Sequence, residues 1–105
     1  MNIKKYIAEL IGTFALALVV SLASTLGLGI VTTFLAGVTL ALFVYSIGHL
    51  SGSHINPAVT IGAFSIKKIS WQDAIMYIIA QFAGAALAII VFNLYHITRA
   101  ANLPP

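Results

Sequence analysis

The polar stretch at residues 51–60, SGSHINPAVT, constrains this chain more than any other feature. It interrupts an otherwise hydrophobic sequence and leads into a short apolar run that ends at Lys67. Asn56 is a favoured helix N-cap and Pro57 suits the first helical position, so we predict a helix at about residues 56–66. At 1.5 Å per residue it would be roughly 15 Å long, about half the hydrocarbon thickness of a bilayer.

The composition indicates that lipid is the solvent for most of the surface. Of the 105 residues, 61% are apolar and 7% are charged, and the mean hydropathy is +1.08. Two acids and five bases cannot cover a soluble domain. The small positive charge lies near the ends of the apolar runs, which is typical of membrane topology and not of nucleic-acid binding. We therefore predict an all-α membrane protein whose partner is membrane lipid.

Three apolar runs are long enough to cross a bilayer, at about residues 6–24, 30–47 and 72–95. The first is too long for the apolar part of a signal peptide and no clear cleavage site follows it, so we expect it to be retained. Trp71, Tyr77 and Tyr95 are expected to lie at the membrane interfaces.

Between the second and third runs, we expect an irregular loop at 48–55 and then the half-helix. The fold predicted for residues 1–105 is thus three transmembrane helices plus one re-entrant half-helix, forming a single unit. The tail at 98–105, which ends in Leu-Pro-Pro, is expected to be a linker or a disordered end.

Three spans place the two termini on opposite sides of the membrane. The N-terminal side then carries four of the five bases, and Arg99 stands alone on the other side; the four are Lys4, Lys5, Lys67 and Lys68. The positive-inside rule predicts a cytoplasmic N-terminus.

Each predicted span carries a row of small residues four apart, which allows close approach of helix backbones. The rows are Ala8-xxx-Gly12, Gly37-xxx-Ala41 and Ala80-xxx-Gly84-xxx-Ala88. Rows in all three spans favour a tight bundle.

Two polar side chains fall inside the predicted spans. Glu9 either pairs with Lys5 at interface depth or accepts hydrogen bonds from the irregular backbone before the half-helix, whose N–H groups need partners. A proton relay would need a second acid in the membrane. We expect Gln81 to form a buried hydrogen-bonding bracket, to the loop or to another helix, in preference to binding a ligand.

No catalytic or metal-binding constellation is visible. His49 and His54 are not spaced as a helical pair and lack a third ligand nearby. Nucleophile–base pairs, paired carboxylates and phosphate-binding glycine loops are also missing from the sequence. We expect no enzyme activity, metal or cofactor. Four residues are instead expected to stabilise the loop and present its carbonyls, namely Ser51, Gly52, Ser53 and His54.

Irregular backbone at membrane depth is tolerated only where it is buried in protein or lines a water-filled cavity. The loop therefore predicts a cavity with carbonyl acceptors along it and the amide donors of Asn56. The N-terminus of the half-helix carries about half a positive charge, which opposes cations and protons. Such a lining suits neutral molecules that both donate and accept hydrogen bonds, such as water or a polyol.

These residues resemble a known family. Residues 48–62, GHLSGSHINPAVTIG, are similar to the first Asn-Pro-Ala loop of the aquaporin (major intrinsic protein) family, and AELIGTF at 8–14 and Ala80-Gln81 match it too. The resemblance covers nearly the whole chain. It implies that Asn56, Pro57 and Ala58 line a pore.

The resemblance also implies six spans and two half-helices from two inverted repeats, assembled as tetramers. Only the first repeat is present here, so one copy cannot enclose a channel. The second half would come from a longer chain cut near residue 103, from a separate chain, or from an inverted second copy. The uneven distribution of bases disfavours dual insertion. We favour an incomplete sequence, with a native half-channel as the alternative.

By the same resemblance, the second-span position of the family's aromatic/arginine filter falls on Ala36. Water-selective relatives usually carry an aromatic residue there, so this side of the filter is expected to be wider.

Two functions remain open. The chain is either part of a passive channel for water or small neutral solutes such as glycerol, or a non-conducting membrane scaffold or fragment. The expected location is the cell membrane.

Overall fold

The computed structural model describes residues 2–104, and all the regular secondary structure in that range is helical. Its four helices are α1 (Ile3–Thr25), α2 (Ile30–Ser51), α3 (Pro57–Ser65) and α4 (Trp71–Ala101). Three of them, α1, α2 and α4, are long and apolar enough to cross a membrane, whereas α3 has only nine residues. The predicted fold class, an all-α membrane protein with three spans and one short helix, is confirmed.

The helix ends follow from local sequence. Asn2 caps α1, with Oδ1 accepting a hydrogen bond from the Lys4 N–H, and Ser70 caps α4 through the Asp73 N–H. Asn56 caps α3, its Oδ1 lying 2.8 Å from the Ala58 nitrogen. Side-chain acceptors at these positions satisfy N–H groups that a helix leaves without partners.

All three long helices exceed their predicted bounds, α1 by beginning at Ile3 and the other two mainly at their C-terminal ends. α2 continues through Ser51, so the irregular segment begins at Gly52 and not at residue 48. A single helical glycine such as Gly48 is tolerated, whereas Gly52 ends the helix with a left-handed φ of +85°. α4 likewise continues to Ala101, so residues 98–101 of the expected tail are helical and a turn follows before Pro104. Pro105 lies outside the described residues.

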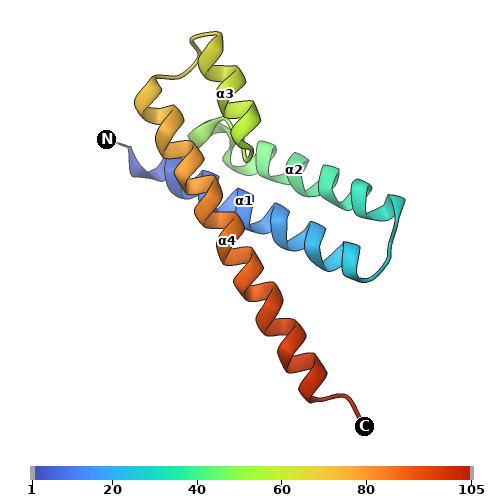
Figure 1. Cartoon of the computed structure of the whole chain (residues 1–105). Coiled ribbons are helices and arrows are strands. Elements are labelled where there is room, and N and C mark those ends of the chain that lie inside the picture. The colour runs from blue at the N-terminus through green and yellow to red at the C-terminus, as the bar shows by residue number, and fades with distance from the viewer. Residues whose placement is uncertain (1, 105) are drawn as a thin grey trace.

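Helix α1 is central. It packs against α4 and α2, and α3 lies against α4 (Figure 1). At the membrane end near the N-terminus, Tyr6 and Tyr77 form an edge-to-face pair with ring centroids 6.0 Å apart. Asp73 joins the same two helices by accepting hydrogen bonds from Lys5 Nζ and Tyr6 Oη, both at 2.6 Å. Toward its C-terminal end, α4 diverges from α1 (Figure 1).

Close packing of α1 and α4 depends on Gly84. A Cβ atom built at this position would collide with the Leu10 carbonyl oxygen and lie 3.0 Å from the Phe14 nitrogen. The other small residues of these rows are also buried, namely Ala8 and Gly12 on α1 and Ala80 and Ala88 on α4. A Cβ atom at Gly12 would meet Ile55 of the loop and Ile47 of α2. Two of the three predicted rows of small residues therefore make helix contacts.

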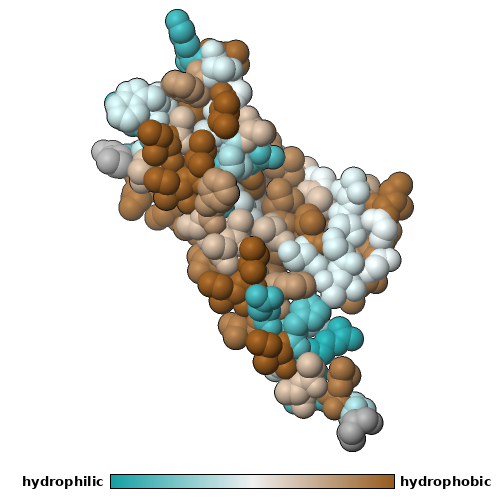
Figure 2. All heavy atoms as spheres, in the orientation of Figure 1, coloured by the Kyte–Doolittle hydropathy of each residue, from teal (hydrophilic) through white to brown (hydrophobic). Residues whose placement is uncertain are grey.

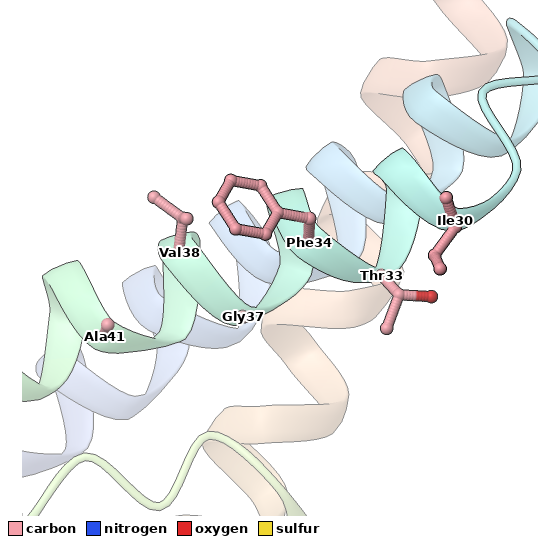
Figure 3. A pocket seen from close by; sticks show the side chains of 6 residues that line it. All are labelled: Ile30, Thr33, Phe34, Gly37, Val38 and Ala41. Atoms are coloured by element: carbon pink, nitrogen blue, oxygen red, sulfur yellow. The ribbon is translucent and has the colours of Figure 1, made fainter.

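The third row does not pack within the described chain. Gly37 and Ala41 are exposed on α2, where they line an open groove of about 460 Å³ with Ile30, Thr33, Phe34 and Val38 (Figure 3). We expected the small residues of all three spans to lie at helix contacts, and within the described residues this is wrong for the row on α2. A row of small residues permits a close approach, but a partner must also lie on that face.

Much of the outer surface is apolar (Figure 2). Large hydrophobic side chains are exposed on all four helices, including Phe34, Phe64 and Phe82 at 72%, 46% and 65%. Soluble monomers do not expose apolar surface on this scale. The chain is an integral membrane protein, and lipid or further protein covers this surface.

Candidate functional site: the re-entrant loop and its support

Residues 52–56 form the re-entrant loop, which connects α2 to the short helix α3. Three of its residues have left-handed backbone angles, Gly52 at φ +85°, Ser53 at +52° and Ile55 at +53°. Only glycine adopts such angles freely, and a β-branched residue such as Ile55 does so under strain. Surrounding contacts must therefore hold this backbone in place.

Glu9 on α1 supplies the central contact. Its side chain is fully buried, and each carboxylate oxygen accepts two hydrogen bonds. Oε1 lies 2.7 Å from Ser51 Oγ and 2.9 Å from the His54 nitrogen. Oε2 lies 2.6 Å from the Ile55 nitrogen and 2.9 Å from Gln81 Nε2. Four donors replace the hydration that a carboxylate loses on burial, and two of them are loop N–H groups.

The structure shows Glu9 accepting hydrogen bonds from the loop backbone, and not paired with Lys5. Lys5 pairs with Asp73 on α4 and not with Glu9. The reason is the neighbour of each side chain, since Asp73 in the first turn of α4 accepts hydrogen bonds from Lys5 and Tyr6, whereas Glu9, about one turn further along α1, lies beside the loop donors.

Gln81 on α4 connects the loop to α3. Its Nε2 donates to Glu9 and also to Thr60 Oγ1 at 2.9 Å. Thr60 is fully buried, and the Nδ1 atom of His54 lies 3.0 Å from the same hydroxyl. The amide thus joins the side chain that supports the loop to the half-helix, and both of its partners lie on other helices, α1 and α3.

Tyr77 is a support residue whose contact with the loop the sequence did not predict. It is 3% exposed, and its hydroxyl donates to the Ser51 carbonyl oxygen at 2.7 Å. Its ring also packs edge-on against His54, with centroids 5.0 Å apart. Tyr77 precedes Gln81 by four residues, so the two share a helix face, and this spacing was the available signal. Thr60 was missed because threonine occurs widely in apolar helices.

Asn56 occupies the exposed end of the site. Its Oδ1 is used by the cap of α3, while its side chain remains exposed beside Ala58. Within residues 2–104, no hydrogen bond is accepted by the carbonyl oxygens of residues 52–55. The loop N–H groups of residues 54 and 55 donate to Glu9. The carbonyl oxygens of the loop remain available to accept hydrogen bonds from a solute.

The structure does not bring Ala36 to the loop. It is half-buried on α2, about 22 Å from Ser51 along the helix axis at 1.5 Å per residue. Ser51, Ser53 and His54 do gather around Glu9 and Thr60, and Gly52 ends α2 beside them. Among the described residues, no three His, Asp or Glu side chains are grouped to hold a metal ion.

The arrangement defines a membrane hemi-repeat, in which three spanning helices hold a re-entrant loop and a half-length helix through one buried carboxylate. The family model for the major intrinsic proteins matches residues 1–103, and the chain belongs to that family. The aquaporins of this family are channels and not enzymes, in agreement with the expectation from the sequence.

Individual relatives agree. The chain is 41% identical to aquaporin AqpM of Methanothermobacter thermautotrophicus, over 85% of this chain and 46% of the relative. It is also 41% identical to aquaporin Z of Rhodopseudomonas palustris, over 84% of this chain and 40% of the relative. A shorter match, 47% identical, covers 54% of this chain and 21% of aquaporin-1 of Ovis aries. The chain therefore spans less than half the length of these relatives.

Proposed function

We propose that this chain forms half of the wall of a passive channel for water or small neutral solutes such as glycerol. The observation that carries the proposal is the exposed end of the site. Asn56 stands at the N-terminus of α3 beside a loop whose carbonyl oxygens are free, while the loop N–H groups are bound by Glu9. Amide donors next to carbonyl acceptors match a solute that forms both kinds of hydrogen bond.

Exclusion of ions follows from the same geometry. The N-terminus of α3 carries a partial positive charge of about half a unit, and no acid lies at the exposed end of the loop to offset it. Glu9 cannot act in this way because its oxygens are buried and fully engaged by four donors. Cations would meet a repulsive helix end without a carboxylate to bind them.

A second, inverted repeat is required to close the pore. It is supplied by a longer chain, by a separate chain or by an inverted copy, and we propose that complete pores assemble as tetramers in the cell membrane with the N-terminus cytoplasmic. The bases near the N-terminus, Lys4 and Lys5, and those after α3, Lys67 and Lys68, support this orientation. Ala36 would form one wall of the narrowest point.

Osmotic shrinking of proteoliposomes tests the proposal. Vesicles that contain the folded chain together with the second half of a relative such as aquaporin Z should shrink faster in stopped-flow light scattering than empty vesicles, in proportion to the amount of protein. Vesicles that contain the chain alone should shrink faster than empty vesicles only if an inverted copy supplies the second half. Rates equal to those of empty vesicles in both arms, with the protein folded and inserted, would instead support the alternative function of a non-conducting scaffold.

A further inference from the structure

Two adjoining cavities lie between the C-terminal end of α1 and the C-terminal part of α4. One, of about 190 Å³, is lined by Leu22, Thr25, Leu26, Tyr95, His96 and Arg99. The other, of about 340 Å³, shares Thr25, His96 and Arg99 with the first. We call the two cavities together the Arg99 crevice. Figure 2 shows hydrophilic atoms gathered beside the C-terminal half of α4, near the end of α1, on an otherwise largely hydrophobic helix.

The guanidinium of Arg99 lacks a counter-ion from the described chain. The sequence has two acids, and both are engaged elsewhere: Glu9 by the re-entrant loop, and Asp73 by Lys5. Within residues 2–104, the Arg99 guanidinium forms a single side-chain hydrogen bond, to Tyr95 Oη at 3.4 Å. A guanidinium beside an apolar surface is a strong site for a planar or tetrahedral oxyanion.

His96 adds a second unpaired group. Its ring packs between Phe92 and Tyr95, with centroid distances of 4.4 Å and 5.6 Å. Its Nε2 atom is buried but has no hydrogen-bond partner among the described residues. Buried ring nitrogens normally have partners, so the missing one points to a ligand oxygen supplied from outside the chain.

The expected depth of Arg99 in the membrane indicates which oxyanion lies beside it. Trp71 and Arg99 are separated by about 42 Å along α4 at 1.5 Å per residue. This equals the bilayer thickness including headgroups, about 40–45 Å. With Trp71 at one interface, Arg99 lies at the phosphate level of the opposite leaflet. Tyr95 is then placed where aromatic side chains concentrate, and Leu22 lies deeper, at the level of the acyl chains.

We propose that the Arg99 crevice binds one phospholipid. The guanidinium pairs with the headgroup phosphate, His96 Nε2 forms a hydrogen bond to a phosphate or ester oxygen, and Leu22 and Leu26 contact the acyl chain. This site is separate from the re-entrant loop and does not depend on conduction.

Native mass spectrometry of the detergent-purified chain, titrated with phosphatidylglycerol, tests the proposal. We expect saturable binding of one lipid, with affinity lowered about tenfold by Arg99→Gln. His96→Phe, which keeps a ring but removes the nitrogens, should lower it severalfold. Lys68→Gln is the matched control, because it removes the same charge at the opposite membrane end and should leave the affinity unchanged.

A galactosyl diacylglycerol with the same acyl chains, which lacks phosphate, should bind weakly and without dependence on Arg99. Equal losses in Arg99→Gln and Lys68→Gln would overturn the proposal in favour of general attraction to net charge. Displacement of the phospholipid by millimolar inorganic phosphate would also overturn it, since the site would then serve a free anion. If Arg99→Gln fails to fold, Arg99→Lys, which keeps the charge and loses the fork, should show an intermediate loss; unchanged affinity would contradict the site.

Discussion

The Glu9 carboxylate lies 2.6 Å from the backbone nitrogen of Ile55, a residue 46 positions away in the chain with a φ of +53°. A β-branched residue keeps this angle only when its surroundings determine it. The same carboxylate binds the N–H of the preceding residue, His54. One buried side chain on α1 thus determines the conformation of a loop that belongs to a different part of the sequence.

Glu9→Gln should destabilise the protein by about 3 kcal/mol. The amide keeps one acceptor but turns an NH2 group toward two donors, which leaves buried groups unpaired. Unfolding in mixed micelles with increasing denaturing detergent, followed by circular dichroism, measures the loss. Asp73→Asn is the matched control, because its ion pair is partly exposed and should contribute about 1 kcal/mol or less. Equal losses in the two variants would contradict the role assigned to Glu9.

Tyr77→Phe should cost about 1–3 kcal/mol. The substitution keeps the ring packing against His54 and removes only the hydroxyl, so that the buried Ser51 carbonyl loses its side-chain donor. Thermal unfolding in detergent measures the effect. Tyr45→Phe removes the same hydroxyl from a side chain that is 92% exposed and should change stability little. A midpoint for Tyr77→Phe no lower than that for Tyr45→Phe would show that this hydrogen bond is dispensable.

Gly84→Ala should weaken the α1–α4 crossing by about 1–3 kcal/mol, since the new methyl group meets the Leu10 backbone and cannot be accommodated by a side-chain rotation. Gly37→Ala provides the comparison. A Cβ atom at Gly37 meets nothing within 4 Å, and alanine is the better helix former, so stability should hold or rise. The same unfolding assay ranks the two variants, and the reverse order would exclude close packing at Gly84.

Asn56→Asp should leave stability nearly unchanged while raising cation leakage. Aspartate caps a helix as well as asparagine does, so α3 keeps its N-cap, but a negative charge then offsets the positive helix end. Potassium leakage and osmotic water flow in the same proteoliposomes give the readout. Asn102→Asp, at the end of α4, makes the same chemical change away from the loop and should be silent. Unchanged leakage and unchanged water flow in Asn56→Asp would remove Asn56 from the proposed pore.

Ala36→Phe should reduce glycerol flux several times more than water flux, because an aromatic side chain would narrow the proposed constriction. Swelling in glycerol gradients and shrinking in sucrose gradients separate the two fluxes. Ala41→Phe places the same side chain in the outward groove of α2 and should affect neither. Equal reduction of both fluxes, or none, would contradict the position assigned to Ala36.

The sequence by itself determined the membrane class, the three spans, the half-helix and the family. Each of these follows from information that is local in the chain. Apolar runs of sufficient length indicate spans, and the residues HINPA combine a turn, a cap and a helix start within five positions. The donors left without partners by an irregular loop also made support of the loop one of the two roles open to Glu9.

Only the tertiary structure decided which residues meet. Lys5 and Glu9 lie four residues apart on the same helix, so the partner of Glu9 depends on the segments that pack against α1: Asp73 of α4 pairs with Lys5, and the loop donates to Glu9. The approach of α4 to α1 is in turn set where Gly84 admits the Leu10 backbone. The same crossing buries Tyr77 under the loop, while Gly37 faces outward despite an identical local pattern. Helix periodicity shows which side chains share a face, but the neighbour of that face comes from packing between distant segments.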